Sequence, residues 1–369
     1  MLGMNATLTS NRPTTLLLAC ACLMVTALAG CNDSKTAGKT PAEMKPVVKR
    51  TPTPATPTVA TTKATNPMDA ERAMSYLTQM CAFGPRYSGS AGMLRQRAMI
   101  AKLFESLGAT VREQEFKMPH PITRQQIDCV NLIVEWQPEA KERVLLCAHY
   151  DTRPLPDRDP NPRRRREGVF VGANDGASGV AVLMELGNHL ADTKLEVGVD
   201  MVMFDAEEML FEDDYGRRRG EYFWGSSYFA NQYKQKPPAY KYRWGVLLDM
   251  VGDAELELLQ EKYSLQYCRP LVMEIWQTAA RLGVDEFVPR TKRRRTDGFI
   301  RDDHIPLNQI AKIPSCDIID ADYPDVPFGA PGAYWHTEQD IPQNCSGESL
   351  AKVSWVLLEW LKSQPAESK

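Results

Sequence analysis

The sequence predicts an α/β fold with a central, twisted, mostly parallel but mixed β-sheet that is flanked by helices. Short apolar segments that end in polar residues alternate with segments of helical periodicity along most of the chain. This alternation is typical of parallel strands joined by helices, because each crossover places a helix over one face of the sheet. The length of 369 residues allows one large domain of this kind with ample apolar content for a core.

The elements are expected within residues 67–363, which we predict to form a single domain. Helices are predicted where apolar residues recur every three or four positions, and strands where short apolar runs lie between Gly, Pro or polar residues. The first half contains helices 70–80 and 93–107, separated by the helix breaker at 84–85, and then strands 110–116, 128–136 and 142–149. In the second half, helices 180–190, 226–232 and 347–361 alternate with strands 199–205, 244–253 and 313–320.

Residues 1–30 are predicted to be a signal peptide rather than part of the fold. An apolar run from Leu16 to Leu28 follows Arg12 and leads through small residues to Cys31. The ending LAGC resembles the bacterial lipobox, which implies that Cys31 is acylated and becomes the mature N-terminus. The alternatives are an ordinary signal peptide or a membrane anchor, but the run is short for a span. We expect an exported protein anchored by lipid to a bacterial membrane, on its periplasmic or cell-surface side.

A tether is predicted over residues 31–66, which are rich in Thr, Pro, Ala and Lys and contain almost no large apolar residues. Such a segment would hold the domain away from the bilayer. Nine cysteines occur, of which six follow Cys31, and none forms a close CxxC pair. Export permits disulfides, but their connectivity is not readable, and Cys129, Cys147 and Cys316 fit small buried residues in strands.

The net charge of -3 gives no electrostatic footprint for nucleic acid, and we expect no nucleic-acid partner. Short basic runs nevertheless occur at Arg163–Arg166, Arg217–Arg219 and Lys292–Arg295. They fit solvated loops, and the functional alternatives are contact with an acidic substrate or with anionic lipid. The sequence contains no G-x-S-x-G, H-E-x-x-H or G-x-G-x-x-G pattern, which argues against a serine hydrolase, an HExxH metalloprotease and a Rossmann dehydrogenase.

The segment VDMVMFDAEEML, residues 199–210, is the part of the chain most indicative of chemistry. A buried apolar run there ends in Asp205, Glu207 and Glu208, which a core strand would not carry without a use for them. Adjacent glutamates point in different directions, so one can bind a cation while its neighbour transfers protons. The alternative is a solvated loop whose glutamates stabilise a helix N-terminus.

Polar residues also end the other predicted strands, at His149, Asp151 and Asp249, although Asp151 alone fits a residue that braces a turn. The carboxyl ends of parallel strands meet at one edge of a sheet, and converging anions repel each other unless a cation neutralises them. Zinc accepts a mixture of imidazole and carboxylate ligands. Further candidate ligands from this sequence are Asp175 in GANDGASG, Asp302 to His304 in RDDHIPL, and His336 in YWHTEQD.

Taken in order, the motifs HYD, GANDGASG, DAEE, LLDMVGD, RDDHIPL and YWHT resemble the zinc aminopeptidase and glutaminyl-peptide cyclotransferase superfamily. The resemblance covers nearly all of residues 67–363 and implies a zinc-exopeptidase-like single domain. It implies that Asp175, Glu208 and His336 bind zinc and that Glu207 is the general acid/base.

The resemblance leaves two reactions open. A cyclotransferase uses one zinc ion and converts an N-terminal Gln to pyroglutamate with release of ammonia, with Asp249 and Asp302 as further catalytic residues and Trp335 in the substrate pocket. An aminopeptidase binds a second zinc through His149 and Asp249, with Asp175 bridging, and hydrolyses N-terminal residues. The pair Asp302 and Trp335 favours the cyclotransferase, because aminopeptidases of this family usually carry a small residue at the position of Asp302.

GANDGASG is closer to the peptidase motif, and the segment after the glutamates lacks the Trp of animal cyclotransferases, for which Trp224 is a possible substitute. A third alternative is a noncatalytic peptide-binding lipoprotein, because a fold does not dictate function. The complete ligand set and Glu207 argue against it. We expect peptide or protein N-termini as substrates and a monomeric protein.

Overall fold

The computed structural model describes residues 65–213, 215–289, 298–324, 326, 330 and 333–366. The predicted signal peptide, Cys31 and the predicted tether up to residue 64 lie outside these residues, as does the basic run Lys292–Arg295. Within the described ranges, none of the helices combines the length and the apolar character that a membrane crossing requires.

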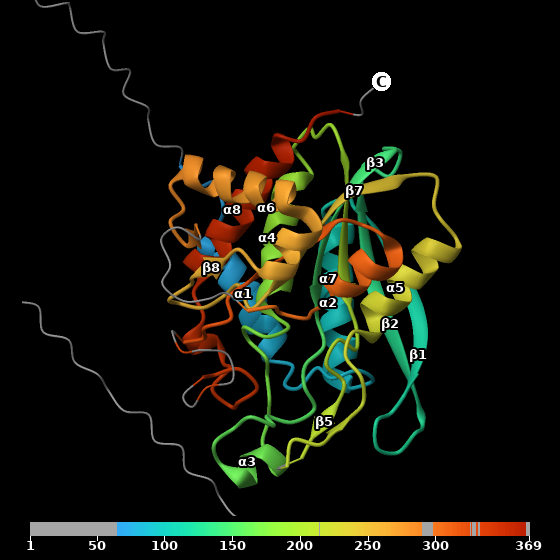
Figure 1. Cartoon of the computed structure of the whole chain (residues 1–369), viewed down its shortest axis with the longest axis vertical. Coiled ribbons are helices and arrows are strands. Elements are labelled where there is room, and N and C mark those ends of the chain that lie inside the picture. The colour runs from blue at the N-terminus through green and yellow to red at the C-terminus, as the bar shows by residue number, and fades with distance from the viewer. Residues whose placement is uncertain are drawn as a thin grey trace, which may run out of the picture. The chain divides into compact units, whose positions relative to one another are not determined.

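A six-stranded mixed sheet forms the centre of the domain, with the strand order β1-β2-β4-β3-β7-β10 (Figure 1). The four strands β4, β3, β7 and β10 are mutually parallel, whereas β2 is antiparallel to both β4 and β1. This arrangement confirms the predicted mostly parallel, mixed sheet. The strands are β1 (Thr110–Pro119), β2 (Gln126–Trp136), β3 (Glu142–His149), β4 (Gly198–Phe204), β7 (Lys241–Asp249) and β10 (Ser315–Ile319).

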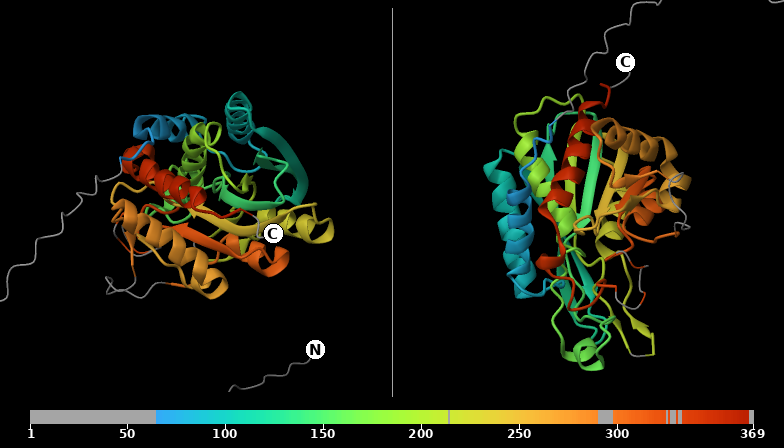
Figure 2. Two further views of the ribbon diagram at one scale, coloured as in Figure 1. Left: turned by 90° about the horizontal axis from the view of Figure 1, so that it is seen from above. Right: turned by 90° about the vertical axis from the view of Figure 1, so that its left-hand side faces the viewer.

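Helices cover both faces of the sheet, as the two views of Figure 2 show. Alternate residues of β3 point to opposite faces, so Val144 and Leu146 belong to one core while Leu145 and Cys147 belong to the other. The larger core is covered by α1 (Ala70–Cys81), α2 (Ala91–Ser106), α4 (Ser178–Leu190), α6 (Lys262–Leu282) and α8 (Gly347–Lys362). The smaller core is covered by α5 (Trp224–Gln235) and the π-helix η2 (Leu307–Ala311), which follows α7 (His304–Pro306).

Short helices and two-residue strands lie within the loops of the described chain. They are α3 (Pro162–Glu167), β5 (Phe211–Glu212), β6 (Arg218–Arg219), β8 (Leu258–Leu259), β9 (Phe287–Val288) and η3 (Pro342–Asn344). The basic runs Arg163–Arg166 and Arg217–Arg219 therefore lie on α3 and on the β5–β6 hairpin.

The predicted elements are found within a few residues of their expected bounds. Helix α2 begins earlier than expected because Ser90 caps it, its Oγ accepting a hydrogen bond from the Met93 N–H at 3.1 Å. Helix α6 is absent from the sequence-based prediction. Pro270 lies inside it and Cys268 has non-helical backbone angles, so the apolar periodicity is interrupted where the helix kinks.

The six cysteines of the described chain are free, and all but the half-buried Cys345 are buried. This confirms that Cys129, Cys147 and Cys316 are small buried residues of strands β2, β3 and β10. The described part of the domain is therefore held by its two cores rather than by disulfides.

The parallel strands deliver their carboxyl ends to the same edge of the sheet, with β3 ending at His149 and β7 at Asp249. Helix α4 crosses close to this edge because Gly179 lies in its first turn. A Cβ atom at Gly179 would lie only 2.3 Å from the Leu248 carbonyl oxygen. The absence of a side chain lets the loop before α4, which carries Asp175, approach the end of β7.

We predict that Gly179→Ala lowers the free energy of unfolding by about 2 kcal/mol, because the added methyl group forces α4 away from the β7 backbone. Urea denaturation measures the change. Gly298→Ala is the matched control, since a Cβ there meets no atom of the described residues within 4 Å, and it should change stability by less than about 0.5 kcal/mol. Equal effects of the two substitutions would contradict this account of the helix–strand contact.

Candidate metal centre

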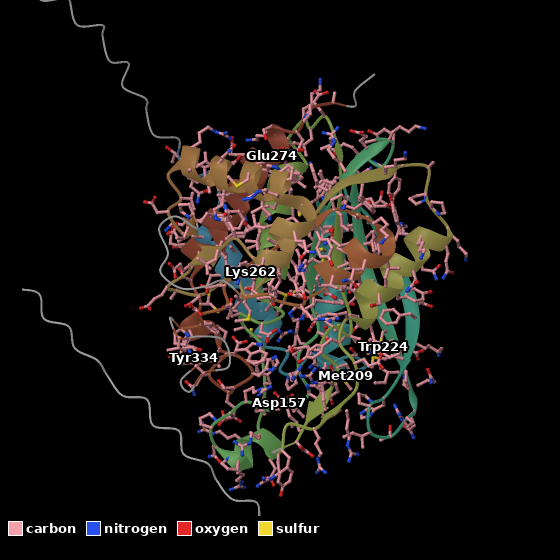
Figure 3. All side chains as sticks on the ribbon, viewed as in Figure 1. Asp157, Met209, Trp224, Lys262, Glu274 and Tyr334 are labelled. Atoms are coloured by element: carbon pink, nitrogen blue, oxygen red, sulfur yellow. The ribbon has the colours of Figure 1, made fainter. Side chains whose placement is uncertain are left out.

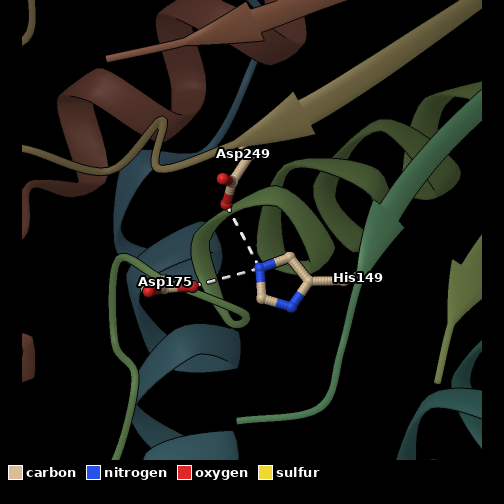
Figure 4. A group of neighbouring side chains, drawn as sticks. All are labelled: His149, Asp175 and Asp249. Atoms are coloured by element: carbon tan, nitrogen blue, oxygen red, sulfur yellow. Dashed lines mark hydrogen bonds and ion pairs between the residues drawn. The ribbon is translucent and has the colours of Figure 1, made fainter. Parts of the chain in front are cut away.

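Three side chains from separate segments meet at the carboxyl edge of the sheet (Figure 4). His149 ends β3, Asp249 ends β7, and Asp175 lies in the loop before α4. The His149 Nε2 atom is 3.1 Å from Asp175 Oδ1 and 3.2 Å from Asp249 Oδ1. These distances bring one imidazole and two carboxylates around a common point.

A second group of three adjoins the first and shares Asp175 with it. The His336 Nε2 atom is 3.2 Å from Asp175 Oδ2 and 3.0 Å from Glu208 Oε2. Within each group the possible ligand atoms all lie within 4.8 Å of one another. The structure thus brings together both sets of residues that the sequence predicts, with one oxygen of Asp175 facing each set.

The second group fits a zinc ion by the chemistry of its donors, which are one imidazole nitrogen and two carboxylates at the end of separate loops. All three residues are at most 3% exposed, so their charges are removed from water. Asp175 Oδ2 is buried and accepts no hydrogen bond from any described residue, although His336 Nε2 lies 3.2 Å away. A shared cation would satisfy this oxygen and reduce the repulsion between the carboxylates.

Glu207 lies beside the two groups without belonging to either. Burial raises the pKa of its carboxyl well above the usual value, an effect that His149 opposes and Asp302 reinforces. No hydrogen bond to this carboxylate is made by the described part of the chain. The adjacent glutamates therefore point to different surroundings, as predicted, with Glu208 among the possible ligands and Glu207 next to them.

The turn that presents the two glutamates is held by Asp151. Its carboxylate accepts hydrogen bonds from the backbone N–H groups of Glu207 and Glu208, at 2.9 and 3.1 Å. Ala206, just before them, has a φ of 58°, a left-handed conformation that is unfavourable for a residue with a Cβ. Asp151 thus braces a turn, as one of the two interpretations proposed.

Asp302 and His304, which belong to one predicted motif, lie in two different environments. Burial and the charge of Asp249 raise the pKa of Asp302 well above its usual value, so Asp302 lies close to the His149 group. No hydrogen bond joins Asp302 to Asp249 within the described ranges. His304 does not join either group, because its ring nitrogens face Glu261 and Asp317, each at 3.7 Å.

The indole of Trp335 stacks on the imidazole of His336, with ring centres 3.8 Å apart. Trp335 is half-buried, so it is positioned to cover one side of the candidate centre. Trp224 instead packs with Ala206 and Met209 in a separate small apolar cluster. Of these two tryptophans, Trp335 is therefore the one that lies next to the predicted ligands.

Sequence reasoning missed several residues that hold the ligands in place. Asp157 Oδ1 lies 3.3 Å from His336 Nδ1, which leaves Nε2 directed toward the centre. Asp157 Oδ2 accepts a hydrogen bond from Arg153 Nε at 2.9 Å, and the Arg153 backbone N–H donates to Glu208 Oε1 at 2.6 Å. Figure 3 labels Asp157 in the lower half of the view, where two other loop residues, Met209 and Tyr334, are also labelled.

Asp340 has a similar supporting role for Asp175. Its carboxylate accepts hydrogen bonds from the backbone N–H groups of Asn174 and Asp175, at 2.7 and 3.0 Å, and from the Tyr323 hydroxyl at 3.2 Å. Neither Asp157 nor Asp340 has a distinctive signal in the sequence, because each is one acidic residue in a polar loop. Their roles follow from contacts between loops that are distant in the chain.

The fold and the paired donor sets at its strand ends define a metal-dependent α/β enzyme. Peptidase family M28 matches residues 131–361, and the chain belongs to this family. The match confirms the resemblance inferred from the order of the motifs.

The chain is similar to solved structures of two kinds. It is 39% identical to Fimbriiglobus ruber glutaminyl cyclase, with a TM-score of 0.74 over 82% of this chain and 97% of that one. It is 31% identical to a Zn-dependent exopeptidase from Parabacteroides distasonis, with a TM-score of 0.72 over 80% of this chain and 99% of that one. Among curated proteins, the glutaminyl-peptide cyclotransferase of Bos taurus is 24% identical over 74% of this chain and 76% of its own length.

We predict that Asp340→Asn weakens zinc binding about 10- to 100-fold, because an amide cannot accept both backbone hydrogen bonds that fix the Asp175 loop. Competition with a chelator of known affinity measures the change on purified protein. Tyr323→Phe, which removes only one hydrogen bond to Asp340, should have a smaller effect. Unchanged zinc affinity in Asp340→Asn would show that the loop needs no such support.

Proposed function

We propose that the chain is a zinc-dependent glutaminyl-peptide cyclotransferase that acts on peptide or protein N-termini as a monomer. It converts an N-terminal glutaminyl residue to pyroglutamate and releases ammonia. The similarity to glutaminyl cyclases supports the reaction class. The observation that carries the choice within the family is the buried carboxyl of Asp302 beside Asp249.

Burial and the charge of Asp249 raise the pKa of the Asp302 carboxyl well above its usual value, which favours a protonated Asp302. A carboxyl that keeps its proton beside Asp249 can bind and orient the nitrogen that leaves as ammonia. The aminopeptidase branch, which the resemblance associates with a small residue at position 302, would leave Asp249 free to bind a second metal. Asp302 therefore favours cyclisation with one zinc ion.

Asp175, Glu208 and His336 would hold that zinc ion. Bound there, zinc supplies a Lewis acid for the oxygen of the substrate's side-chain amide, which gains charge during the reaction. Glu207 accepts a proton from the substrate's α-amine as the nitrogen attacks the amide carbon. It returns the proton to the departing nitrogen when the carbon–nitrogen bond of the amide breaks, so the reaction consumes no water.

The position of Glu207 suits this proton transfer. A carboxylate bound to the metal would be a weak base, but Glu207 lies beside the ligand set, and its burial raises the pKa of the carboxyl. Such a raised pKa improves proton exchange near neutral pH. Trp335, stacked on His336, forms a wall of the pocket that receives the glutaminyl side chain. A noncatalytic binding protein would have no use for Glu207 in this place.

The second candidate is a zinc aminopeptidase with two metal ions. It is favoured by one specific observation, which is that His149, Asp175 and Asp249 form a complete second donor set sharing Asp175 with the first. In that enzyme Glu207 would activate a water molecule to cleave the first peptide bond. The two candidates thus differ in metal count and in substrate.

We predict one tightly held zinc ion per chain in the purified protein. His336→Ala should lose it, because one of three ligands is removed, whereas His149→Ala should retain it. Elemental analysis after exhaustive dialysis measures the ratio. Two ions per chain, with one lost in His149→Ala, would identify the second donor set as occupied and favour the aminopeptidase.

We predict that the protein releases ammonia from a Gln-initiated peptide and leaves a Leu-initiated peptide intact, as followed by mass spectrometry. Glu207→Gln should slow ammonia release by about 10²- to 10⁴-fold, because the proton acceptor is lost, while retaining zinc. Removal of the first residue from either peptide, abolished by Glu207→Gln, would refute cyclisation as the main reaction.

We also propose that Cys31 is acylated after removal of residues 1–30 and that the domain is tethered to a membrane outside the cytoplasm. The LAGC ending and the Thr/Pro-rich composition of the tether support this location. Cys31→Ser should move the protein from the membrane fraction to the soluble fraction and remove the mass of the acyl chains, because the variant has no cysteine to carry the lipid that binds the membrane. An unchanged distribution and mature mass would contradict the anchor.

A further inference from the structure

Two arginines surround one glutamate at the rim of the candidate centre. Arg158 Nη2 lies 2.9 Å from Glu212 Oε1, and Arg218 Nε lies 3.5 Å from Glu212 Oε2. The Glu212 side chain is 9% exposed, whereas those of Arg158 and Arg218 are 41% and 48% exposed. The carboxylate is thus covered by two guanidinium groups that face solvent, so the surface carries an excess of positive charge.

Each of these arginines lies over an aromatic ring that belongs to the surroundings of the proposed zinc ligands. The Arg158 guanidinium lies 5.5 Å from the centre of the Trp335 ring, which stacks on His336, and the Arg158 N–H donates to the His336 carbonyl at 3.0 Å. The Arg218 guanidinium lies 5.0 Å from the centre of the Tyr222 ring.

Tyr222 connects Arg218 to Glu208 indirectly, through Arg153. Its hydroxyl accepts a hydrogen bond from Arg153 Nη1 at 3.0 Å, and Arg153 donates its backbone N–H to Glu208. The positive rim, defined as Arg158 and Arg218, is therefore built onto the residues that hold Glu208 and His336.

Other arginines of the predicted basic runs have carboxylate partners of their own. Arg163 pairs with Glu167 at 3.2 Å, Arg164 with Glu338 at 3.0 Å, and Arg217 with Asp213 at 2.7 Å. In contrast, Arg158 and Arg218 share a single carboxylate. The positive rim therefore carries one positive charge more than its carboxylate balances, whereas each of these three pairs is neutral.

We propose that Arg158 and Arg218 select substrates with an acidic side chain shortly after the N-terminal glutamine. This inference rests on the proposed cyclotransferase function. With the glutaminyl residue beside Trp335, the rest of the peptide leaves the pocket across the rim. An extended chain advances about 3.3 Å per residue, so the second to fourth residues pass the guanidinium groups, which pair readily with carboxylates.

The test compares kcat/KM for ammonia release from three peptides that differ only at the second residue, namely Gln-Glu, Gln-Gln and Gln-Lys. The unaltered protein should prefer Glu over Gln and disfavour Lys. Arg158→Gln and Arg218→Gln should each lower the Glu:Gln ratio about threefold, the magnitude of a half-exposed ion pair, and the double variant by more. Arg158→Glu should shift the preference toward the Lys peptide.

The ratio separates selection from structural damage, because a distorted pocket slows all three peptides together. Arg112→Gln is the matched control, since Arg112 lies on β1 in a half-exposed pair with Glu135 at 2.9 Å and should leave the ratio unchanged. The preference should also weaken as salt is raised, as expected for exposed charges.

The outcomes distinguish this inference from the function on which it rests. If no Gln-initiated peptide loses ammonia, the proposed function fails. If all three turn over equally and the rim variants leave the ratio unchanged, the cyclotransferase stands and the selection by charge is wrong. If the variants reduce binding to vesicles of anionic lipid without changing the ratio, the rim contacts a membrane and the inference is overturned.

Discussion

The burial of several carboxylates at one edge of a sheet is the constraint on which the rest of this structure depends. Asp175, Glu207, Glu208 and Asp302 are each at most 8% exposed, and Asp249 ends the neighbouring strand. Removing anions from water is costly, and their mutual repulsion adds to the cost. A cation between the donor sets, a proton shared by some of the carboxyls, and nearby imidazole and guanidinium groups are the means of offsetting it. The proposed reaction uses the same cation and the same protonated carboxyl groups.

Other buried carboxylates near the site hold loops in place by accepting hydrogen bonds from the backbone. Asp151 accepts two backbone N–H groups from the turn that carries the glutamates, and Asp340 accepts two from the loop of Asp175. These loops need support, because left-handed backbone angles occur next to the proposed functional side chains. The φ values are 58° at Ala206, 50° at Met250 and 56° at His336. Such strain persists only where surrounding contacts hold it.

One donor arrangement is compatible with two reactions, which explains why cyclases and exopeptidases occur side by side among the similar structures. Asp175 directs one oxygen to each donor set, and the proposed proton carrier Glu207 lies beside both sets. The distinction therefore lies in the groups around the core of the site. These groups include Asp302, whose pKa is raised by burial and by the charge of Asp249, and Trp335, whose ring centre lies 5.5 Å from the Arg158 guanidinium.

Much of the fold and of the candidate site was predictable from the sequence, because both depend on patterns formed by residues that are adjacent in the chain. A strand such as β3 is defined by consecutive apolar residues, and its polar end at His149 is adjacent in the chain. The same holds for Asp249 and for Glu207 with Glu208. Helix α6 escaped this reasoning because a kink at Cys268 and Pro270 disturbs the periodicity on which the prediction relies.

The sequence by itself determined the mixed α/β sheet and the polar strand ends, since each depends on residues close together in the chain. The order of its motifs also identified the candidate ligands through the family resemblance. Only the tertiary structure decided that Asp175 faces both donor sets, that Asp157 and Asp340 fix the ligands, and that His304 turns away from the centre. The contacts by which Asp340 supports Asp175 and Asp157 supports His336 join loops that are separated by more than a hundred residues. Packing of the helices on the sheet sets such distances, and no local pattern encodes them.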